Sequence, residues 1–205
     1  MTDGIDSLMA QLRSEADADR DAATTPDVGI VMGSDSDMPV MREAAATLTE
    51  LGFDEARLGA TPPAERFSFE SLVVSAHRTP DLMYAYAETA AARGLEIVIA
   101  GAGGKSADLP NMVASIAFPL PVIGVPIDER SLESVIGMPS GAPLVAVDAG
   151  KADNAALSAV QMMARSRPAL EDALVAFGTE LRTDVGAVSR ELAESGVEAF
   201  LADRD

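Results

Sequence analysis

From Val28 onward the chain alternates short apolar runs with longer segments of helical periodicity. The runs are closed by Gly, Ser or Pro, and they lie at 28–32, 72–75, 96–100, 121–125 and 144–147. This alternation is typical of βαβ units, whose parallel sheet is buried on both faces. The pattern therefore predicts an α/β protein with three layers, α/β/α, around a doubly wound parallel sheet of five strands.

Helical segments are expected between these runs. Pro39 and Pro80 each stand where a helix can begin, because the missing N–H of a first-turn proline leaves no hydrogen bond unmade. The periodicity predicts helices at 39–51, 80–93, 109–117 and 154–164, with a short one at 132–136.

Three further segments extend or interrupt this pattern. Residues 1–26 form an acidic leader that we expect to be an accessory helix followed by a linker, with apolar residues on one helical face at Ile5, Leu8, Met9 and Leu12. The connection Gly52–Ser71 is long and contains several Gly and Pro residues, so we expect a surface insertion at about 53–71 within a catalytic domain spanning 27–167. Residues 168–205 continue at helical spacing and are expected to pack between subunits.

Composition excludes several functions. The net charge of −18 repels nucleic acid and anionic membranes. No run of about twenty apolar residues exists, so a cytoplasmic protein is expected. The chain has no cysteine and one histidine, which excludes thiolate metal sites and zinc sites built from several imidazoles of one chain. The acidic excess also resembles proteins adapted to high salt, and we treat that adaptation as a hypothesis.

Polar segments follow three of the predicted strands. They are Gly33–Asp37, Ser75–Pro80 and Gly101–Ser106. In open α/β sheets ligands bind beyond the carboxyl ends of the strands, so the three segments are expected to meet at one edge.

The first segment suits a phosphorylated ligand. Backbone N–H groups at a helix start attract anions, which assigns Ser34 to a phosphate and Asp37 to ribose hydroxyls. The alternative is that these side chains simply cap the helix.

The second segment holds the only histidine, His77, beside Arg78. Imidazole titrates near neutral pH and suits proton transfer, while guanidinium suits phosphate or carboxylate. The alternatives are a structural histidine and an ordinary surface ion pair.

The third segment does not fit either common nucleotide motif. A P-loop would need glycine at Ile99, and the dinucleotide fingerprint would need glycine or alanine at Ser106. The remaining interpretation is a glycine turn that brings the backbone against a flat ligand, with Lys105 nearby. The alternative is a tight turn that binds no ligand.

Together these segments resemble the class I PurE family, the N5-carboxyaminoimidazole ribonucleotide mutases, across roughly Val28–Ala164. The resemblance rests on Gly-Ser-x-Ser-Asp, Ser-Ala-His-Arg-Thr-Pro and Gly-Ala-Gly-Gly in order, then Leu109-Pro110, Gly124-Val125-Pro126, Met138-Pro139 with Gly141, Gly150-Lys151 and Asn154-Ala155-Ala156.

The resemblance implies a flavodoxin-like fold and a homo-octamer that acts on an aminoimidazole ribonucleotide without metal, biotin or ATP. It implies that His77 handles protons during carboxylate transfer in purine synthesis. The substrate-binding residues are expected to be Ser34, Asp37, Ser75, Ala76, Arg78, Gly101, Gly103, Gly104, Lys105 and Leu109.

The chain departs from the family pattern in one loop. Asp108 stands where many relatives have histidine, Asn111 replaces a common glycine, and the stretch at 105–107 is one residue longer. Two other functions stay open: direct carboxylation of aminoimidazole ribonucleotide with CO2, the class II activity, and a nonenzymatic nucleotide sensor. The Gly101–Gly104 run favours class I, and the His-Arg pair disfavours the sensor.

Overall fold

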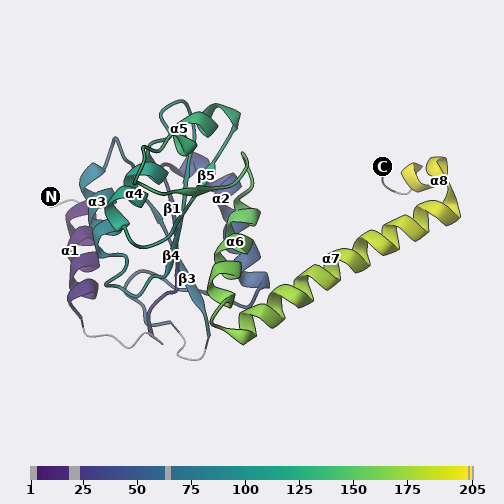
Figure 1. Cartoon of the computed structure of the whole chain (residues 1–205), viewed down its shortest axis with the longest axis horizontal. Coiled ribbons are helices and arrows are strands. Elements are labelled where there is room, and N and C mark those ends of the chain that lie inside the picture. Colours follow the sequence, from purple (N-terminus) through teal and green to yellow (C-terminus); the bar gives the residue numbers. More distant parts are fainter. Residues whose placement is uncertain (1–3, 19–23, 63–65, 203, 205) are drawn as a thin grey trace.

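The computed structural model describes residues 4–18, 24–62, 66–202 and 204, and it contains a parallel sheet between two layers of helices (Figure 1). The strand order is β2-β3-β1-β4-β5-β6. The strands are β1 (Val28–Met32), β2 (Asp54–Glu55), β3 (Ser68–Val73), β4 (Ile97–Ala102), β5 (Val122–Pro126) and β6 (Val145–Ala146). The predicted α/β/α fold with a doubly wound parallel sheet is confirmed, with six strands in place of five.

Helices cover both faces of the sheet. One face carries α1 (Gly4–Asp17), α3 (Pro80–Thr89) and α4 (Leu109–Ala117). The other carries α2 (Met38–Glu50), α6 (Ala152–Ala164) and the start of α7 (Pro168–Ser195). Two short 3-10 turns, η2 (Asp35–Asp37) and η3 (Glu129–Ser131), and the short helices α5 (Leu132–Ile136) and α8 (Val197–Ala202) complete the described chain.

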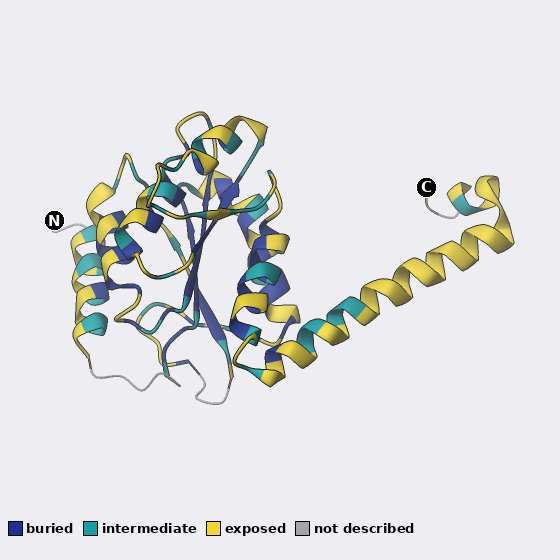
Figure 2. Cartoon of the chain, viewed as in Figure 1, coloured by how far each residue is buried: buried dark blue, intermediate teal, exposed yellow. Residues whose placement is uncertain are grey.

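The central strands form the core. Every residue of β1, β4 and β5 is buried, and Figure 2 shows these strands in dark blue between the two helical layers. Burying a large aliphatic side chain contributes roughly 1.5–3 kcal/mol. The continuous apolar runs that predicted these strands reflect this burial on both faces.

The predicted insertion at about 53–71 is wrong at both of its ends. Asp54 and Glu55 form the edge strand β2, paired in parallel with Ser68 and Phe69 of β3. The first half of β3 does not form an apolar run, because it contains the polar residues Ser68 and Glu70, although both are buried. Residues 63–65 lie outside the described part of the chain.

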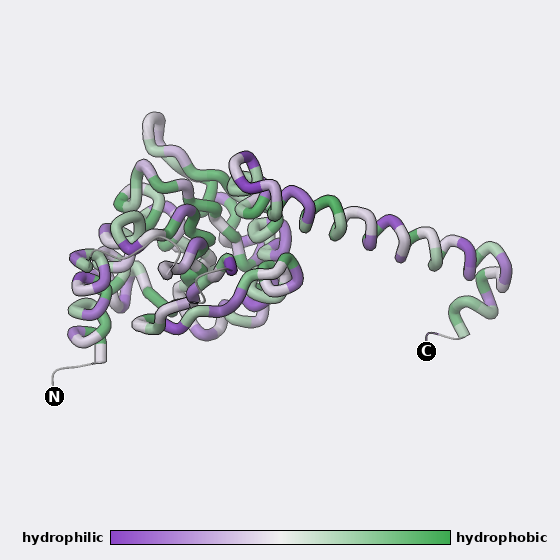
Figure 3. The backbone as a smooth tube through the Cα atoms, turned by 90° about the horizontal axis from the view of Figure 1, so that it is seen from below, coloured by the Kyte–Doolittle hydropathy of each residue, from purple (hydrophilic) through white to green (hydrophobic). Residues whose placement is uncertain are grey.

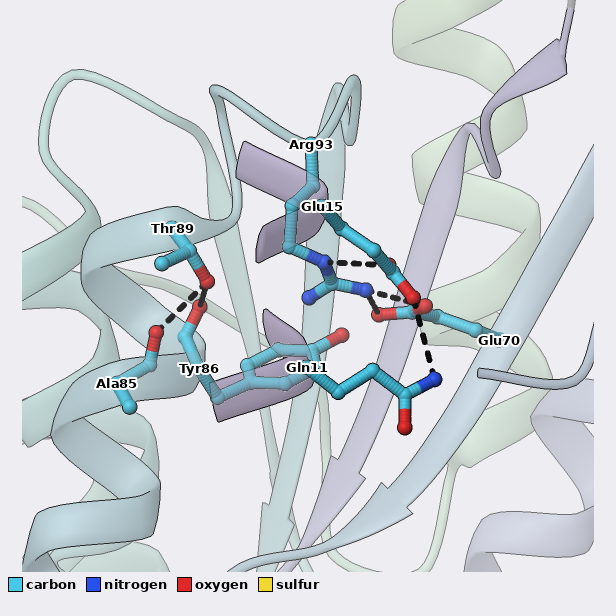
Figure 4. Close-up of polar contacts among 7 residues, drawn as sticks. All are labelled: Gln11, Glu15, Glu70, Ala85, Tyr86, Thr89 and Arg93. Atoms are coloured by element: carbon cyan, nitrogen blue, oxygen red, sulfur yellow. Dashed lines mark hydrogen bonds and ion pairs between the residues drawn. The ribbon is translucent and has the colours of Figure 1, made fainter. Parts of the chain in front are cut away.

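The predicted leader helix exists as α1 and docks on α3. Leu12 is fully buried, and Ile5, Leu8 and Met9 pack against the same core cluster. Behind them lies a buried charged cluster in which Arg93 is paired with Glu70 of β3 and with Glu15 of α1 (Figure 4). Most of the predicted linker after this helix, residues 19–23, lies outside the described part of the chain.

Helix α7 extends away from the body. Its first turns pack on α6 through Leu170, Leu174 and Phe177, and the rest projects beyond the two layers (Figure 1). Hydrophobic and hydrophilic positions alternate along it (Figure 3), and its exposed apolar residues include Leu181, Val185, Val188 and Leu192. None of the helices among the described residues is both long and apolar enough to cross a membrane.

Candidate active site

A cavity of about 610 Å³ opens at the carboxyl end of the sheet, where the predicted segments were expected to meet. Four strands deliver loops to it. The lining residues come from the loops after β1 (Gly33, Ser34, Ser36, Asp37), β3 (Ser75, Ala76, His77, Arg78), β4 (Ala102, Gly103, Gly104, Ser106, Asp108, Leu109) and β5 (Ile127, Asp128, Arg130). The helices that follow β1 and β4 cover opposite faces, so the cavity lies at a topological switch point.

The loop after β1 combines capping with an unusual carboxylate. The Ser34 hydroxyl accepts a hydrogen bond from the Ser36 N–H, so the capping alternative holds for the short turn η2. Asp37 is 6% exposed and its side chain makes no capping bond to α2. Burial raises the pKa of Asp37, while backbone hydrogen bonding at Ser34 and Gly33 and the charge of Arg78 oppose that rise. A nearly buried carboxylate that lines a cavity can accept hydrogen bonds from hydroxyl groups of a ligand.

The loop after β3 is a rigid turn. The Thr79 hydroxyl accepts from the Ser75 N–H at 2.9 Å, and the Ser75 hydroxyl accepts from the Arg78 N–H at 3.2 Å. The Arg78 side chain also reaches across the cavity, where Nη2 donates to the Gly33 carbonyl at 2.9 Å. The guanidinium is thus held in place with further donors facing solvent, as an anion site requires.

His77 projects from the same turn beside Asp108. The His77 Nε2 atom lies 3.1 Å from Oδ2 of Asp108. The histidine side chain is 62% exposed and that of Asp108 is 45% exposed, so the pair lies at the open rim of the cavity. An exposed imidazole with a fixed partner can reach a bound ligand and exchange a proton with it.

The glycines after β4 serve two purposes. A Cβ at Gly101 would lie 2.1 Å from the Met41 sulfur, so this glycine lets α2 pack closely on the sheet. Gly104 has a φ of 85°, a conformation that favours glycine, and no atom lies within 4 Å of its added Cβ position. Gly103 and Gly104 therefore provide bare backbone at the cavity.

The loop after β5 also lines the cavity, a role that the sequence analysis did not assign to it. Asp128 caps η3, accepting hydrogen bonds from the N–H groups of Arg130 and Ser131. Hydrogen bonds from Arg130 and Ser131 lower the pKa of Asp128. Ile127, Asp128 and Arg130 follow the end of a strand directly, so the rule that identified the other three loops would also have found them.

The cavity brings together most of the residues predicted to bind substrate. His77 lines it together with Ser34, Asp37, Ser75, Ala76, Arg78, Gly103, Gly104 and Leu109. Gly101 and Lys105 are not part of the lining. Ser36, Ser106 and Asp108 also line the cavity, although the sequence pattern did not assign any of the three to substrate binding.

The arrangement can bind an anion and move a proton at the same place. Arg78 offers positive charge, the Asp37 carboxylate offers hydrogen-bond acceptors, and His77 lines the same cavity. Nothing in this set is a nucleophile activated by an adjacent base, so the chemistry that fits is proton transfer on a bound phosphorylated ligand.

Comparison with known proteins identifies relatives of the chain. The family model described as AIR carboxylase matches residues 27–184. An N5-carboxyaminoimidazole ribonucleotide mutase of Mycobacterium tuberculosis is 48% identical over 177 residues, covering 83% of this chain and 92% of that protein. A protein of the same name from Pyrococcus horikoshii is 40% identical over 184 residues, covering 87% of this chain and 95% of its own. The crystal structure of Treponema denticola PurE superposes with a TM-score of 0.64 at 22% identity, covering 84% of this chain and 99% of that one, and supports the fold.

Proposed function

The chain belongs to the AIR carboxylase family, and on that premise we propose that it is a mutase of purine synthesis. It converts N5-carboxyaminoimidazole ribonucleotide to 4-carboxy-5-aminoimidazole ribonucleotide. The family resemblance implied an aminoimidazole ribonucleotide as the substrate. The proposed substrate is the form of that compound that carries a carboxylate on its exocyclic nitrogen. The observation that supports the proposal is the cavity that His77, Arg78, Ser34 and Asp37 line together. The mutases of M. tuberculosis and P. horikoshii, at 48% and 40% identity, support it.

The substrate is held through its ribose phosphate. Arg78 and Ser34 bind the phosphate, and Asp37 accepts hydrogen bonds from the ribose hydroxyls. The backbone at Gly103 and Gly104 lies against the flat imidazole, with Ser75, Ala76 and Leu109 around it. Gly101 and Lys105 complete the proposed set, although neither lines the cavity. Gly101 acts indirectly, because it lets α2 pack closely on the end of β4. Lys105 belongs to the loop that follows β4.

The reaction needs a proton moved out and back. His77 in its protonated, imidazolium form donates a proton to the exocyclic nitrogen, the N–C bond of the carbamate breaks, and CO2 is released inside the cavity. Carbon C4 of the ring then attacks the CO2, and the proton that C4 loses returns to His77. Atoms and charge balance without metal, biotin or ATP. Holding CO2 beside C4 makes its recapture effectively intramolecular, which lowers the activation barrier by several kcal/mol.

The fate of the carboxyl carbon tests this reaction. Substrate labelled with 13C in the carbamate is converted in excess unlabelled bicarbonate, and the product is analysed by mass spectrometry at early times. We expect most product to keep the label, and aminoimidazole ribonucleotide with bicarbonate to react poorly. Extensive early dilution of the label, corrected for spontaneous carbamate breakdown, with efficient direct carboxylation would favour the class II carboxylase instead.

We also propose that residues 27–167 are the catalytic domain and that the helices after them join subunits in a homo-octamer. The apolar residues of α7 beyond Phe177, among them Leu181, Val185, Val188 and Leu192, recur at helical spacing and are exposed. Light scattering of the full chain should give eight times the mass of one chain, and Val185→Glu should lower that mass. A monomer at micromolar concentration would contradict the proposal.

The acidic surface fits a cytoplasm of high salt. With a net charge of −18, self-repulsion destabilises the compact chain until counter-ions screen it. The melting temperature should therefore rise as KCl approaches molar concentration. A melting temperature that falls over this range would exclude the adaptation.

A further inference from the structure

Asp108 stands where an aspartate commonly caps a helix, but it does not act as a cap. It immediately precedes Leu109, the first residue of α4. Its side chain accepts no hydrogen bond from the first turn of α4, a segment that lies within the described residues. Helix capping therefore does not explain why a carboxylate stands at this position.

The carboxylate is instead held between two other elements. Its Oδ1 accepts a hydrogen bond from the Ser134 hydroxyl of α5 at 3.2 Å. Asn111, in the first turn of α4, donates through Nδ2 to the Ser134 carbonyl at 2.8 Å and so joins α4 to α5. The other oxygen, Oδ2, lies 3.1 Å from His77 Nε2. Asp108 and Asn111, the two positions that depart from the family pattern, are thus linked through Ser134, and the Asp108 carboxylate of this group lies beside the histidine.

We propose that Asp108 is a positioning residue that fixes the orientation and tautomer of His77. A carboxylate only accepts hydrogen bonds, so the neutral imidazole must carry its proton on Nε2. Nδ1 then keeps its lone pair, and no described residue of the protein hydrogen bonds to it. In the imidazolium form the second proton is on Nδ1. Nδ1 is therefore the atom that gives this proton to the substrate and later takes one back. This inference rests on the proposed function, which makes His77 the proton carrier.

The substitution Asp108→Asn tests the proposal sharply. The Ser134 hydroxyl donates to Oδ1, so the amide oxygen of the new side chain stays on that side and its NH2 group faces His77 Nε2. An NH2 donor favours the opposite tautomer, with the proton on Nδ1. We expect kcat to fall by about tenfold or more, the scale seen when the hydrogen-bond partner of a functional histidine is removed. KM should change much less, because Asp108 is not proposed to touch the phosphate or the ribose.

Companion variants separate positioning from charge and from folding. Asp108→Glu keeps a carboxylate and should retain more of kcat than Asp108→Asn. Ser134→Ala leaves the carboxylate but frees it, so a smaller loss of kcat in the same direction is expected. Asp81→Asn is the matched control, because Asp81 is an exposed acid in the first turn of α3 and lies outside the cavity lining. It should leave both constants unchanged.

A readout that does not depend on turnover comes from the histidine itself. The chain has one histidine, so 15N labelling of histidine gives the ring nitrogens of His77 alone. In the free wild-type enzyme, at a pH where the ring is neutral, the signals should report a proton on Nε2. In Asp108→Asn the fraction with the proton on Nδ1 should rise.

Two results would overturn the inference: an unchanged tautomer in Asp108→Asn, or a changed tautomer with kcat equal to that of the wild type. Failure of the proposed function looks different. In that case the wild type would not convert the carbamate substrate at all, while the NMR experiment would still decide whether Asp108 pairs with His77.

Discussion

Charged residues gather at two places in this fold, and their surroundings differ. At the cavity, His77 and Arg78 are exposed and the Asp108 side chain is partly exposed. Behind α1, the side chain of Arg93 is 0% exposed and that of Glu70 is 4% exposed. The Arg93 guanidinium also lies 5.2 Å from the centre of the Tyr86 ring.

The difference shows what each cluster does. Burial acts to lower the pKa of Arg93, but Glu70 and Tyr86 outweigh it and the pKa is raised. Burial also raises the pKa of Tyr86 well above its ordinary value. These groups therefore keep one charge state and serve structure, since breaking a buried pair leaves a charge unpaired. The cavity keeps its charged groups accessible to a ligand, at little cost to the stability of the free protein.

The largest expected effect is on stability, from Arg93→Met. This substitution leaves the Glu70 carboxylate buried without its partner and should lower the free energy of unfolding by roughly 3–5 kcal/mol. Urea unfolding at fixed protein concentration measures it. The double variant Arg93→Met with Glu70→Leu should recover most of the loss. A loss below about 1 kcal/mol in the single variant would show that the cluster is not structural.

His77→Asn should have the reverse profile. Turnover should fall at least about a hundredfold, the usual lower scale for losing a positioned proton-transfer group. Because the side chain is 62% exposed, the free energy of unfolding should change by no more than about 0.5 kcal/mol. Steady-state kinetics and urea unfolding of the same preparation test both halves. An active variant would remove His77 from the mechanism.

Arg78→Ala should mainly weaken binding. A guanidinium on a phosphate acts in the ground state as well as in the transition state, so KM should rise by about tenfold or more while kcat changes less. Initial rates across a range of substrate concentrations separate the two constants. If KM stayed constant and only the maximal rate fell, Arg78 would not be the phosphate ligand.

The smallest effect concerns Asp37, the one cavity residue that resembles the buried cluster. Burial raises its pKa above the ordinary value of 3.8, so the fold favours the protonated carboxyl. That stabilisation is complete below the unfolded pKa and is lost as pH rises through the raised folded pKa. Asp37→Asn should therefore gain on the order of 0.5 kcal/mol at neutral pH and almost nothing in acid, while KM rises.

Thermal or urea unfolding of both proteins from pH 3 to pH 8 provides the test. A variant that is less stable than the wild type at neutral pH would show that the Asp37 carboxylate contributes to folding rather than to binding.

The same two regions show what the sequence could and could not predict. Ser34, His77, Arg78 and Gly103 were found because each follows the end of an apolar run, and strand ends meet at one edge. The predicted start of β3, residue 72, lies four residues after its actual start at Ser68. A glutamate such as Glu70 normally indicates a surface position, and the sequence does not show that Arg93 pairs with it in the interior. The contact between His77 and Asp108 depends on how two loops approach each other, and local periodicity carries no information about that distance.

The docking of α1 has a consequence for synthesis on the ribosome. Glu15 binds Arg93, which lies 78 residues later in the chain. At elongation rates of roughly 5–20 residues per second, α1 waits roughly 4 to 16 seconds for the helix that covers it. During that interval the apolar side of Leu12 faces solvent or the exit of the tunnel. The first helix to be made therefore docks only after α3, the helix it packs on, has been synthesised.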